Sequence, residues 1–396
     1  MTNSKILKSL TLAFIGLTSI AQAEDAITIK GQVRERSTLT NKNKWQGDKL
    51  SDSHELRTRL GVTAKTSDAS SVHVEFQDTR RMGSNDPINA AAHTAAISEQ
   101  STADAKGVDL HQAFFTMKMG DVTAKLGRQK VKLGSQRVIS SLEWHPVARI
   151  FDGLRLDYKK DKSSLTALGL MTKDAGQEKY VTMSGLFYNY AMDKGSLIDA
   201  YAFYDKNTIN NWDLVYLGGR VKKSFGDFFA EEEFIYQGGE VGEKTSAAFQ
   251  NALRLGMKMG KTTITLGHDI MSGQDEDSED MTLYRNNYAF AHAYFGWMDY
   301  FLVNAAHTGG QGVQDFRLDL STKLGESTTL KVAAHHFMPA TGDGEAFGQE
   351  IDAEIHGKWF AKSKIVLGAA IALPGEGWAK DADPEFTLYF MPIFNF

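Results

Sequence analysis

Side-chain polarity alternates with a period of two along most of this 396-residue chain, and this alternation constrains the fold more than any other feature. Between Asp315 and Leu320 every second residue is apolar and the others are charged, and residues 350–358 largely repeat the pattern. Successive side chains of a β-strand point to opposite faces of a sheet, so each such segment has one apolar and one charged face. The period therefore predicts an all-β fold.

The spacing of the turns separates a membrane barrel from a soluble sandwich, because both share the local alternation. About eighteen segments of roughly 9–14 residues carry the period. Short turns fall at 67–69, 120–121, 160–162, 193–195, 260, 325–327 and 361–363, and longer connections fall at 41–53, 82–106, 132–148, 273–310 and 374–383. Short periplasmic turns and long extracellular loops are typical of a single transmembrane antiparallel β-barrel, which is the fold that we predict.

The N-terminus has the three parts of a secretory signal in order. Lys5 and Lys8 precede an apolar run over 10–20, and Ala21-Gln22-Ala23 supplies the small residues of a cleavage site. Such a run is too short to cross a bilayer as a helix. We therefore expect residues 1–23 to be a signal peptide and residues 24–396 to be the outer-membrane barrel.

The last segment of the chain has a strongly apolar face that ends at the terminal Phe396. This face comprises Phe386, Leu388, Phe390, Phe394 and Phe396. It suits a lipid boundary with aromatic girdles and is similar to the C-terminal signal read by outer-membrane assembly machinery. Pro392 interrupts the segment, and we expect a local bulge there. The two ends together predict a protein of the outer membrane of a Gram-negative bacterium, in contact with outer-membrane lipid.

Composition narrows the class of function. The formal net charge of −5 argues against a nucleic-acid-binding protein, which would be basic. Cysteine is absent, so an exported chain of this kind must be held together without disulfides. The sequence contains no Gly-x-Ser-x-Gly motif, zinc-ligand run or phosphate loop, and we predict no catalytic residue, metal site or cofactor.

Charged residues crowd the faces that we predict to point inward. A charge on the lipid face costs about 2–4 kcal/mol at mid-membrane, and a barrel of roughly 16–18 strands encloses an aqueous channel. Arg34, Arg36, Arg57 and Arg59 form a positive stripe on two adjacent strands. Arginine binds carboxylate or phosphate through its fork of donors. Two interpretations stay open: the stripe selects an anionic solute, or its members pair with acids and hold a polar wall.

Three connections carry further signals. Residues 273–310 are rich in aromatic side chains and too long for a simple connection, which favours a functional loop. Residues 82–106 hold a run of helix formers that would suit a loop folded into or over the pore. The acidic run 275–280 fits either a solvated loop or a calcium site, but it lacks the spacing of an EF-hand.

A series of short motifs follows in order along the chain: Glu55–Gly61, Phe76–Arg80, Gln112–Phe114, Leu126–Gln129, Gly134–Arg137, Arg149–Arg155, Gly296–Phe301, Gly312–Asp315, His335–Phe337 and Gly348–Asp352. Together they resemble the alginate-export family of outer-membrane barrels over nearly the whole mature chain. The resemblance implies an eighteen-stranded barrel whose basic residues guide a polyuronate out of the cell. The chain is shorter than the dedicated alginate secretin, so the polymer substrate stays open.

The resemblance also implies individual pore residues. By position, its basic pore-lining residues correspond to Arg57, Arg59, Arg128, Arg149, Arg155, Arg254 and Arg317, and its acidic ones to Asp152 and Asp315.

Three hypotheses for function follow from the sequence. The first is a channel that passes anionic or polar solutes by diffusion and for which an alginate-like polyuronate is one candidate. The second is a surface-recognition barrel with a plugged lumen and ligand-binding loops. The third is a barrel enzyme, which the absence of a readable nucleophile and base disfavours.

Overall fold

The computed structural model describes residues 26–43, 45, 49–83, 107–174, 176, 178–193, 195–360, 363–379 and 381–396. The predicted signal peptide and the predicted loop segment 84–106 lie outside the described residues. Among the described residues, no helix is long and apolar enough to cross a membrane.

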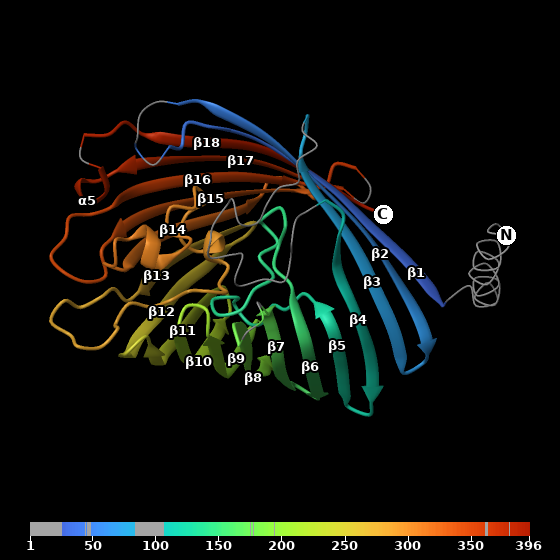
Figure 1. Cartoon of the computed structure of the whole chain (residues 1–396). Helices are drawn as coiled ribbons and strands as arrows, with labels where there is room; N and C mark the ends of the chain where they lie inside the picture. Colours follow the sequence, from blue (N-terminus) through green and yellow to red (C-terminus); the bar gives the residue numbers. More distant parts are fainter. Residues whose placement is uncertain are drawn as a thin grey trace, which may run out of the picture.

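Eighteen antiparallel strands form one closed sheet, which confirms the predicted barrel and strand number. Each strand pairs with its sequence neighbours, and β1 also pairs with β18, so the sheet has no free edge (Figure 1). The strands are β1 (Ile27–Thr40), β2 (Ser51–Ser67), β3 (Ser70–Arg81), β4 (Asp109–Met119), β5 (Val122–Gln129), β6 (Phe151–Lys160), β7 (Ser163–Asp174), β8 (Tyr180–Asp193), β9 (Ser196–Asn207), β10 (Trp212–Phe225), β11 (Phe228–Val241), β12 (Lys244–Met259), β13 (Thr262–Met271), β14 (Val313–Lys323), β15 (Thr328–Met338), β16 (Gly348–Gly357), β17 (Ser363–Pro374) and β18 (Glu385–Asn395).

Short turns gather at one end of the barrel and most long connections at the other, as predicted. The turn between β4 and β5 needs Gly120, whose φ of 60° lies in the left-handed region that other residues rarely adopt. Two connections at the long-loop end, 208–211 and 242–243, are themselves short. The start of β1 and the end of β18 lie at the short-turn end, which faces the periplasm in barrels of this kind.

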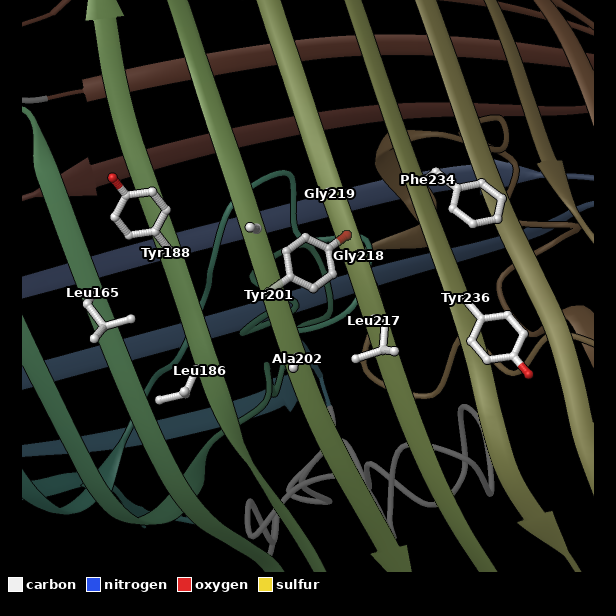
Figure 2. Close-up of a pocket in the computed structure, with 11 residues that line it drawn as sticks. Leu165, Leu186, Tyr188, Tyr201, Ala202, Leu217, Gly218, Gly219, Phe234 and Tyr236 are labelled. Atoms are coloured by element: carbon white, nitrogen blue, oxygen red, sulfur yellow. The ribbon is translucent and has the colours of Figure 1, made fainter.

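The outward face of the strands carries the large exposed apolar side chains that a lipid boundary requires. In β18, Leu388, Phe390 and Phe394 are exposed at alternating positions, as predicted for the last segment. Figure 2 shows another part of this face, where the small residues Ala202 and Gly219 leave a hollow of about 740 Å³ between larger apolar side chains.

The strand has no bulge at Pro392, so the prediction of one is wrong. Pro392 pairs with Ile365 of β17 in an unchanged register, and the β1–β18 pairing keeps one register from Arg34–Ile393 to Ser37–Phe390. Proline lacks the N–H that a ladder needs, so the strand tolerates it by losing local pairing to β1 rather than by inserting a residue.

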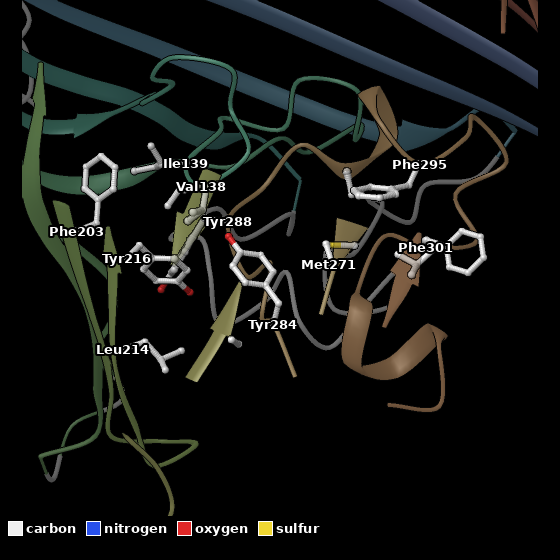
Figure 3. Close-up of a cluster of buried hydrophobic side chains, with 14 of the residues drawn as sticks. Val138, Ile139, Phe203, Leu214, Tyr216, Met271, Tyr284, Tyr288, Phe295 and Phe301 are labelled. Carbon is white, nitrogen blue, oxygen red and sulfur yellow. The ribbon is translucent and has the colours of Figure 1, made fainter. Parts of the chain in front are cut away.

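Most of the large buried apolar side chains lie inside the barrel. Figure 3 shows part of this cluster, which includes wall residues such as Tyr216 together with Val138, Tyr288 and Phe301 from two long connections. One of these connections includes the short helices η1 (Ala291–Ala293) and α4 (Asn304–His307), while α5 (Glu376–Ala379) lies between β17 and β18. The lumen is therefore partly filled by the chain itself.

Candidate functional site

Two long connections fold back into the lumen and form the candidate site, a constriction inside the barrel (Figure 1). Residues 130–150 join β5 to β6, and residues 272–312 join β13 to β14. We call them the first and second inward segments. The aromatic loop that the sequence marked as functional is the second of them.

The first inward segment is bound by the arginine stripe of β1 and β2. Arg34 Nη1 and Arg57 Nη1 donate to the Glu143 carbonyl oxygen at 2.8 and 3.2 Å. Arg59 Nη1 donates to Glu143 Oε2 at 2.7 Å, and Arg36 donates to the carbonyl oxygen of the next residue at 3.2 Å. The predicted stripe is present on adjacent strands, but the segment covers Arg34, Arg57 and Arg59, which are 4–5 % exposed.

Glu143 is the acid that the stripe holds in place. Burial alone would raise the pKa of its carboxyl, but the charges of Arg59, Lys130 and Arg57 outweigh burial and hold that pKa well below its ordinary value. Lys130 Nζ lies 3.3 Å from the second carboxylate oxygen. Glu143 is therefore ionised over the physiological pH range, and the anchor between wall and segment is an ionic one.

Arg149 is the last residue but one of the first inward segment, and its side chain also binds other parts of the protein instead of facing open lumen. Its Nη1 donates to the Tyr288 carbonyl oxygen at 2.6 Å and to the Ser140 carbonyl oxygen at 3.2 Å. Burial lowers the pKa of its guanidinium to about 10, which leaves the group charged at neutral pH. Arg149 therefore joins the two inward segments.

The second inward segment crosses the lumen from one wall to the opposite one. Tyr288 donates to Asp205 of β9 at 2.9 Å, and the backbone N–H of Met298 donates to Glu350 of β16 at 2.7 Å. Seven strand positions separate β9 from β16 in the ring. A segment bound at both places must span the interior.

The two inward segments pack against each other. The backbone N–H of Phe290 donates to the Gln136 carbonyl oxygen at 3.0 Å. The rings of Trp144 and His292 stack with centroids 4.0 Å apart and an interplanar angle of 12°. Figure 3 shows apolar side chains of both segments, including Ile139 and Tyr288, within the buried cluster. The segments therefore form one packed unit across the barrel.

Most of the other predicted arginines pair with acids. The pairs are Arg36–Glu55 at 2.5 Å, Arg155–Asp157 at 2.7 Å, Arg254–Asp269 and Arg317–Asp319. Asp315 is fully buried and accepts a hydrogen bond from His335 at 2.8 Å, so it does not face open lumen. These contacts match the second interpretation of the inward charges, that of a paired polar wall.

The prediction that Arg128 and Asp152 line the pore is wrong. Lys125 and Arg128 lie an odd number of residues apart on β5, so the two side chains point to opposite faces. Arg128 shares the outward face with the exposed Leu126, and Asp152 shares it with the exposed Leu154. Arg128 and Asp152 form an ion pair at 2.9 Å on the outside of the barrel.

A cavity of about 450 Å³ lies between the inward segments and the wall formed by β14 to β18. Trp144, Phe290, His292 and Trp297 line it from the segments, and Lys331 and Lys364 line it from β15 and β17. The period of two places Lys331 in the lumen from sequence alone. Its proximity to Trp297 depends on the fold of a connection without periodicity, which sequence patterns do not reveal.

In the described parts of the chain, no group of three His, Asp or Glu side chains is placed to hold a metal ion. The acidic run 275–280 is largely exposed at the long-loop end, where water solvates its carboxylates.

The alginate-export family matches residues 25–379. This chain belongs to that family. No curated protein sequence matches it.

Solved structures similar to this alginate-export family member are Pseudomonas aeruginosa outer-membrane proteins. OpdL is 9 % identical to this chain with a TM-score of 0.66, and the match covers 93 % of this chain and 98 % of the OpdL chain. OpdO is 10 % identical with a TM-score of 0.64, at 94 % and 97 % coverage. OccD3 (OpdP) is 13 % identical with a TM-score of 0.64, at 94 % and 91 % coverage. At these identities the likeness concerns the fold alone.

Family and fold together establish what kind of protein this is. It is a channel for solutes in the outer membrane of a Gram-negative bacterium, where its barrel lies in the lipid bilayer.

Proposed function

We propose that this channel passes anionic and polar solutes by diffusion, with an alginate-like polyuronate as one candidate. The proposal rests mainly on three lysines that face the lumen near its periplasmic end, Lys30, Lys331 and Lys364. Within the described residues none of the three forms an ion pair, whereas the lumenal arginines are bound to acids or carbonyl oxygens. Diffusion through such a lumen requires neither a catalytic step nor a cofactor.

Free ammonium groups in a narrow lumen raise the local concentration of anions. Walls of low dielectric constant focus the field of such charges, and salt screens them over about 10 Å at 0.1 M ionic strength. A paired arginine contributes little net field at the same distance, because its acid cancels it. Glu354 lies opposite Lys331 in the β15–β16 register and offsets part of this charge, so Lys331, Lys364 and Glu354 together leave one net positive charge at this place in the lumen.

The zero-current potential of the purified protein in a planar bilayer under a salt gradient tests this proposal. We expect anion selectivity that falls in the double variant Lys331→Gln and Lys364→Gln. The matched control is Arg128→Gln, which removes a cation from the outer face. Cation selectivity that the lysine substitutions leave unchanged would rule out the proposal.

A plugged lumen is the second candidate function, and the second inward segment favours it by crossing the interior. A surface-recognition barrel of this kind would conduct poorly until that segment is shortened. Replacement of residues 275–310 by a short linker would then create conductance where the unmodified protein has none. Conductance of similar size in both proteins would exclude the plugged barrel.

We propose further that assembly machinery of the outer membrane reads the terminal Phe396. Two backbone hydrogen bonds of 2.8 and 3.0 Å join Phe396 to Gly31, and its ring is exposed on the outward face at the seam where the barrel closes. Deletion of Phe396 should reduce the yield of folded barrel in cells. Unchanged yield from cells, with refolding in detergent also unchanged, would contradict this role.

A further inference from the structure

The periplasmic rim of the barrel has a notch, because β18 ends before β1 does. The last contact between the two strands is the pair of backbone hydrogen bonds between Phe396 and Gly31, whereas β1 begins earlier, at Ile27. The notch, which we call the rim notch, has a volume of about 1070 Å³ and is lined by residues 29–31, 358–360, 363–364 and 395–396. We propose that the rim notch binds the headgroup of an anionic phospholipid from the periplasmic leaflet of the outer membrane.

Aromatic side chains place the rim notch at the boundary of the membrane. Trp359, Phe360 and Phe396 are 45, 64 and 58 % exposed. The Trp359 ring lies against Gly357 of β16 and the Phe396 ring lies against Gly31 of β1, on the side of the strands that faces lipid. Exposed aromatic rings at the ends of barrel strands form a girdle at the height of the lipid headgroups. The rim notch is therefore open to the headgroups of the periplasmic leaflet.

Lysines supply the charge of the rim notch. Lys30, Lys358 and Lys364 line it, and no Asp or Glu side chain is among the described residues that do so. The described carboxylates that face these lysines are the terminal one of Phe396 and that of Glu354, which lies deeper in the lumen and opposite a fourth lysine on β15. Four ammonium groups thus face two carboxylates, and this part of the rim keeps an excess of positive charge.

The charge of the rim notch is a local feature. The formal net charge of the whole chain is −5, so the barrel as a whole does not attract anionic lipids. Lysines close to the membrane surface attract anionic lipids over the range of the screened field. The positive charge of the rim notch therefore favours anionic lipid at this one place on the rim.

A phospholipid matches both the charge and the aromatic rings of the rim notch. Its phosphate accepts charge-assisted hydrogen bonds from the ammonium groups, and its acyl chains pack beside the exposed rings. A small soluble anion would contact the lysines but leave the rings exposed. A zwitterionic lipid carries its own ammonium group next to the phosphate and gains less from the lysines. The occupant is therefore an anionic phospholipid such as phosphatidylglycerol.

Trp359 makes this binding measurable. All six tryptophans lie in the described part of the chain, and Trp359 is the only exposed one. Bromine atoms on an acyl chain quench the fluorescence of a tryptophan that they approach closely. The purified protein is placed in phosphatidylcholine vesicles that contain increasing shares of brominated phosphatidylglycerol or, in a second series, of brominated phosphatidylcholine. Trp359→Phe measures the signal of the other tryptophans, which is subtracted.

We expect brominated phosphatidylglycerol to quench Trp359 as strongly as about a fivefold larger share of brominated phosphatidylcholine does, which is roughly the effect of one lysine beside anionic lipid. Lys30→Gln with Lys358→Gln should make the two lipids equal. The matched control is Lys118→Gln with Lys261→Gln, which removes two exposed cations from the same end of the barrel and should leave the preference unchanged.

Equal quenching by the two lipids in the unmodified protein would overturn the site. A preference that persists without Lys30 and Lys358, or that the control variant also loses, would overturn it as well, because the charge would then act over the whole rim. None of these results bears on the proposed passage of anions, which the zero-current potential tests separately.

Discussion

Arg59 of β2 and Glu143 of the first inward segment form an ion pair in which Nη1 lies 2.7 Å from Oε2. Arg59 is 5 % exposed, and its Nε also donates to Gln77 of β3 at 2.6 Å. The pair fixes the first inward segment to the wall of the barrel. Because that segment packs on the second one, the contact holds one edge of the whole constriction.

Arg59→Gln should loosen the first inward segment. A hydrogen bond to a charged group contributes about 1.5–3 kcal/mol, so its loss makes the detached segment accessible to thermal motion. We expect more frequent steps between current levels in single-channel recordings. Arg155→Gln is the control, because Arg155 pairs with Asp157 on its own strand and does not contact the segment. A trace as steady as that of the unmodified protein would contradict the anchoring role of Arg59.

The anchor should resist acid because the pKa of Glu143 lies below its ordinary value of 4.5. A carboxyl with a lowered pKa in the folded state stabilises that state above its unfolded pKa, and the contribution is lost as pH falls through the folded value. We therefore expect a steady single-channel current between about pH 5 and pH 7, with frequent steps between current levels only in stronger acid. The variant Glu143→Gln should show such steps at neutral pH as well. Stepping that begins near pH 6 would disagree with this assignment.

The covered arginines should influence selectivity less than the free lysines. Arg57 and Arg59 donate to the first inward segment, and each is at most 5 % exposed. Replacing both by alanine should shift the zero-current potential less than Lys331→Gln with Lys364→Gln, even though each double variant removes two positive charges. A larger shift from the arginine pair would restore the interpretation of the stripe as the anion guide.

Gly368 lies on the inward face of β17, next to the ring of Tyr389. A Cβ added at Gly368 would meet the Tyr389 ring at 2.0 Å, and Tyr389 donates a hydrogen bond to Glu354. Gly368→Ala should displace that ring and cost about 1–3 kcal/mol. The temperature at which the folded band disappears in gel electrophoresis measures the effect. Gly169→Ala on β7 is the matched control, since a Cβ there meets nothing within 4 Å. Equal melting of the two variants would contradict the packing described.

The strands were predictable from the sequence because their side chains obey one local rule. The period of two yields eighteen strands and the inward direction of residues such as Arg254 and Lys331. Arg128 and Asp152 were misplaced because they were assigned from the motif resemblance. The period of two opposes that assignment, because Arg128 lies three residues from the inward Lys125 on β5 and Asp152 lies three residues from the inward Arg155 on β6. The predicted signal peptide at 1–23 stays a prediction.

The constriction was not predictable because the two inward segments that form it show no regular alternation of polar and apolar side chains. The contact between Arg34 and the Glu143 carbonyl oxygen joins residues 109 positions apart. Every residue has a backbone carbonyl oxygen, so the sequence does not show which one Arg34 binds. The aromatic content of 273–310 marked that segment as functional but gave no direction of folding. Its path became clear only from its bonds to β9 and β16.

The rate at which glucuronate crosses liposome membranes containing the channel, measured beside the rate for glucose, tests the central claim most directly. The two solutes have nearly the same size and differ by one carboxylate. A channel with an anion-attracting lumen should pass glucuronate faster than glucose, and Lys331→Gln with Lys364→Gln should bring the two rates together. Faster passage of glucose, unchanged by those substitutions, would contradict the account.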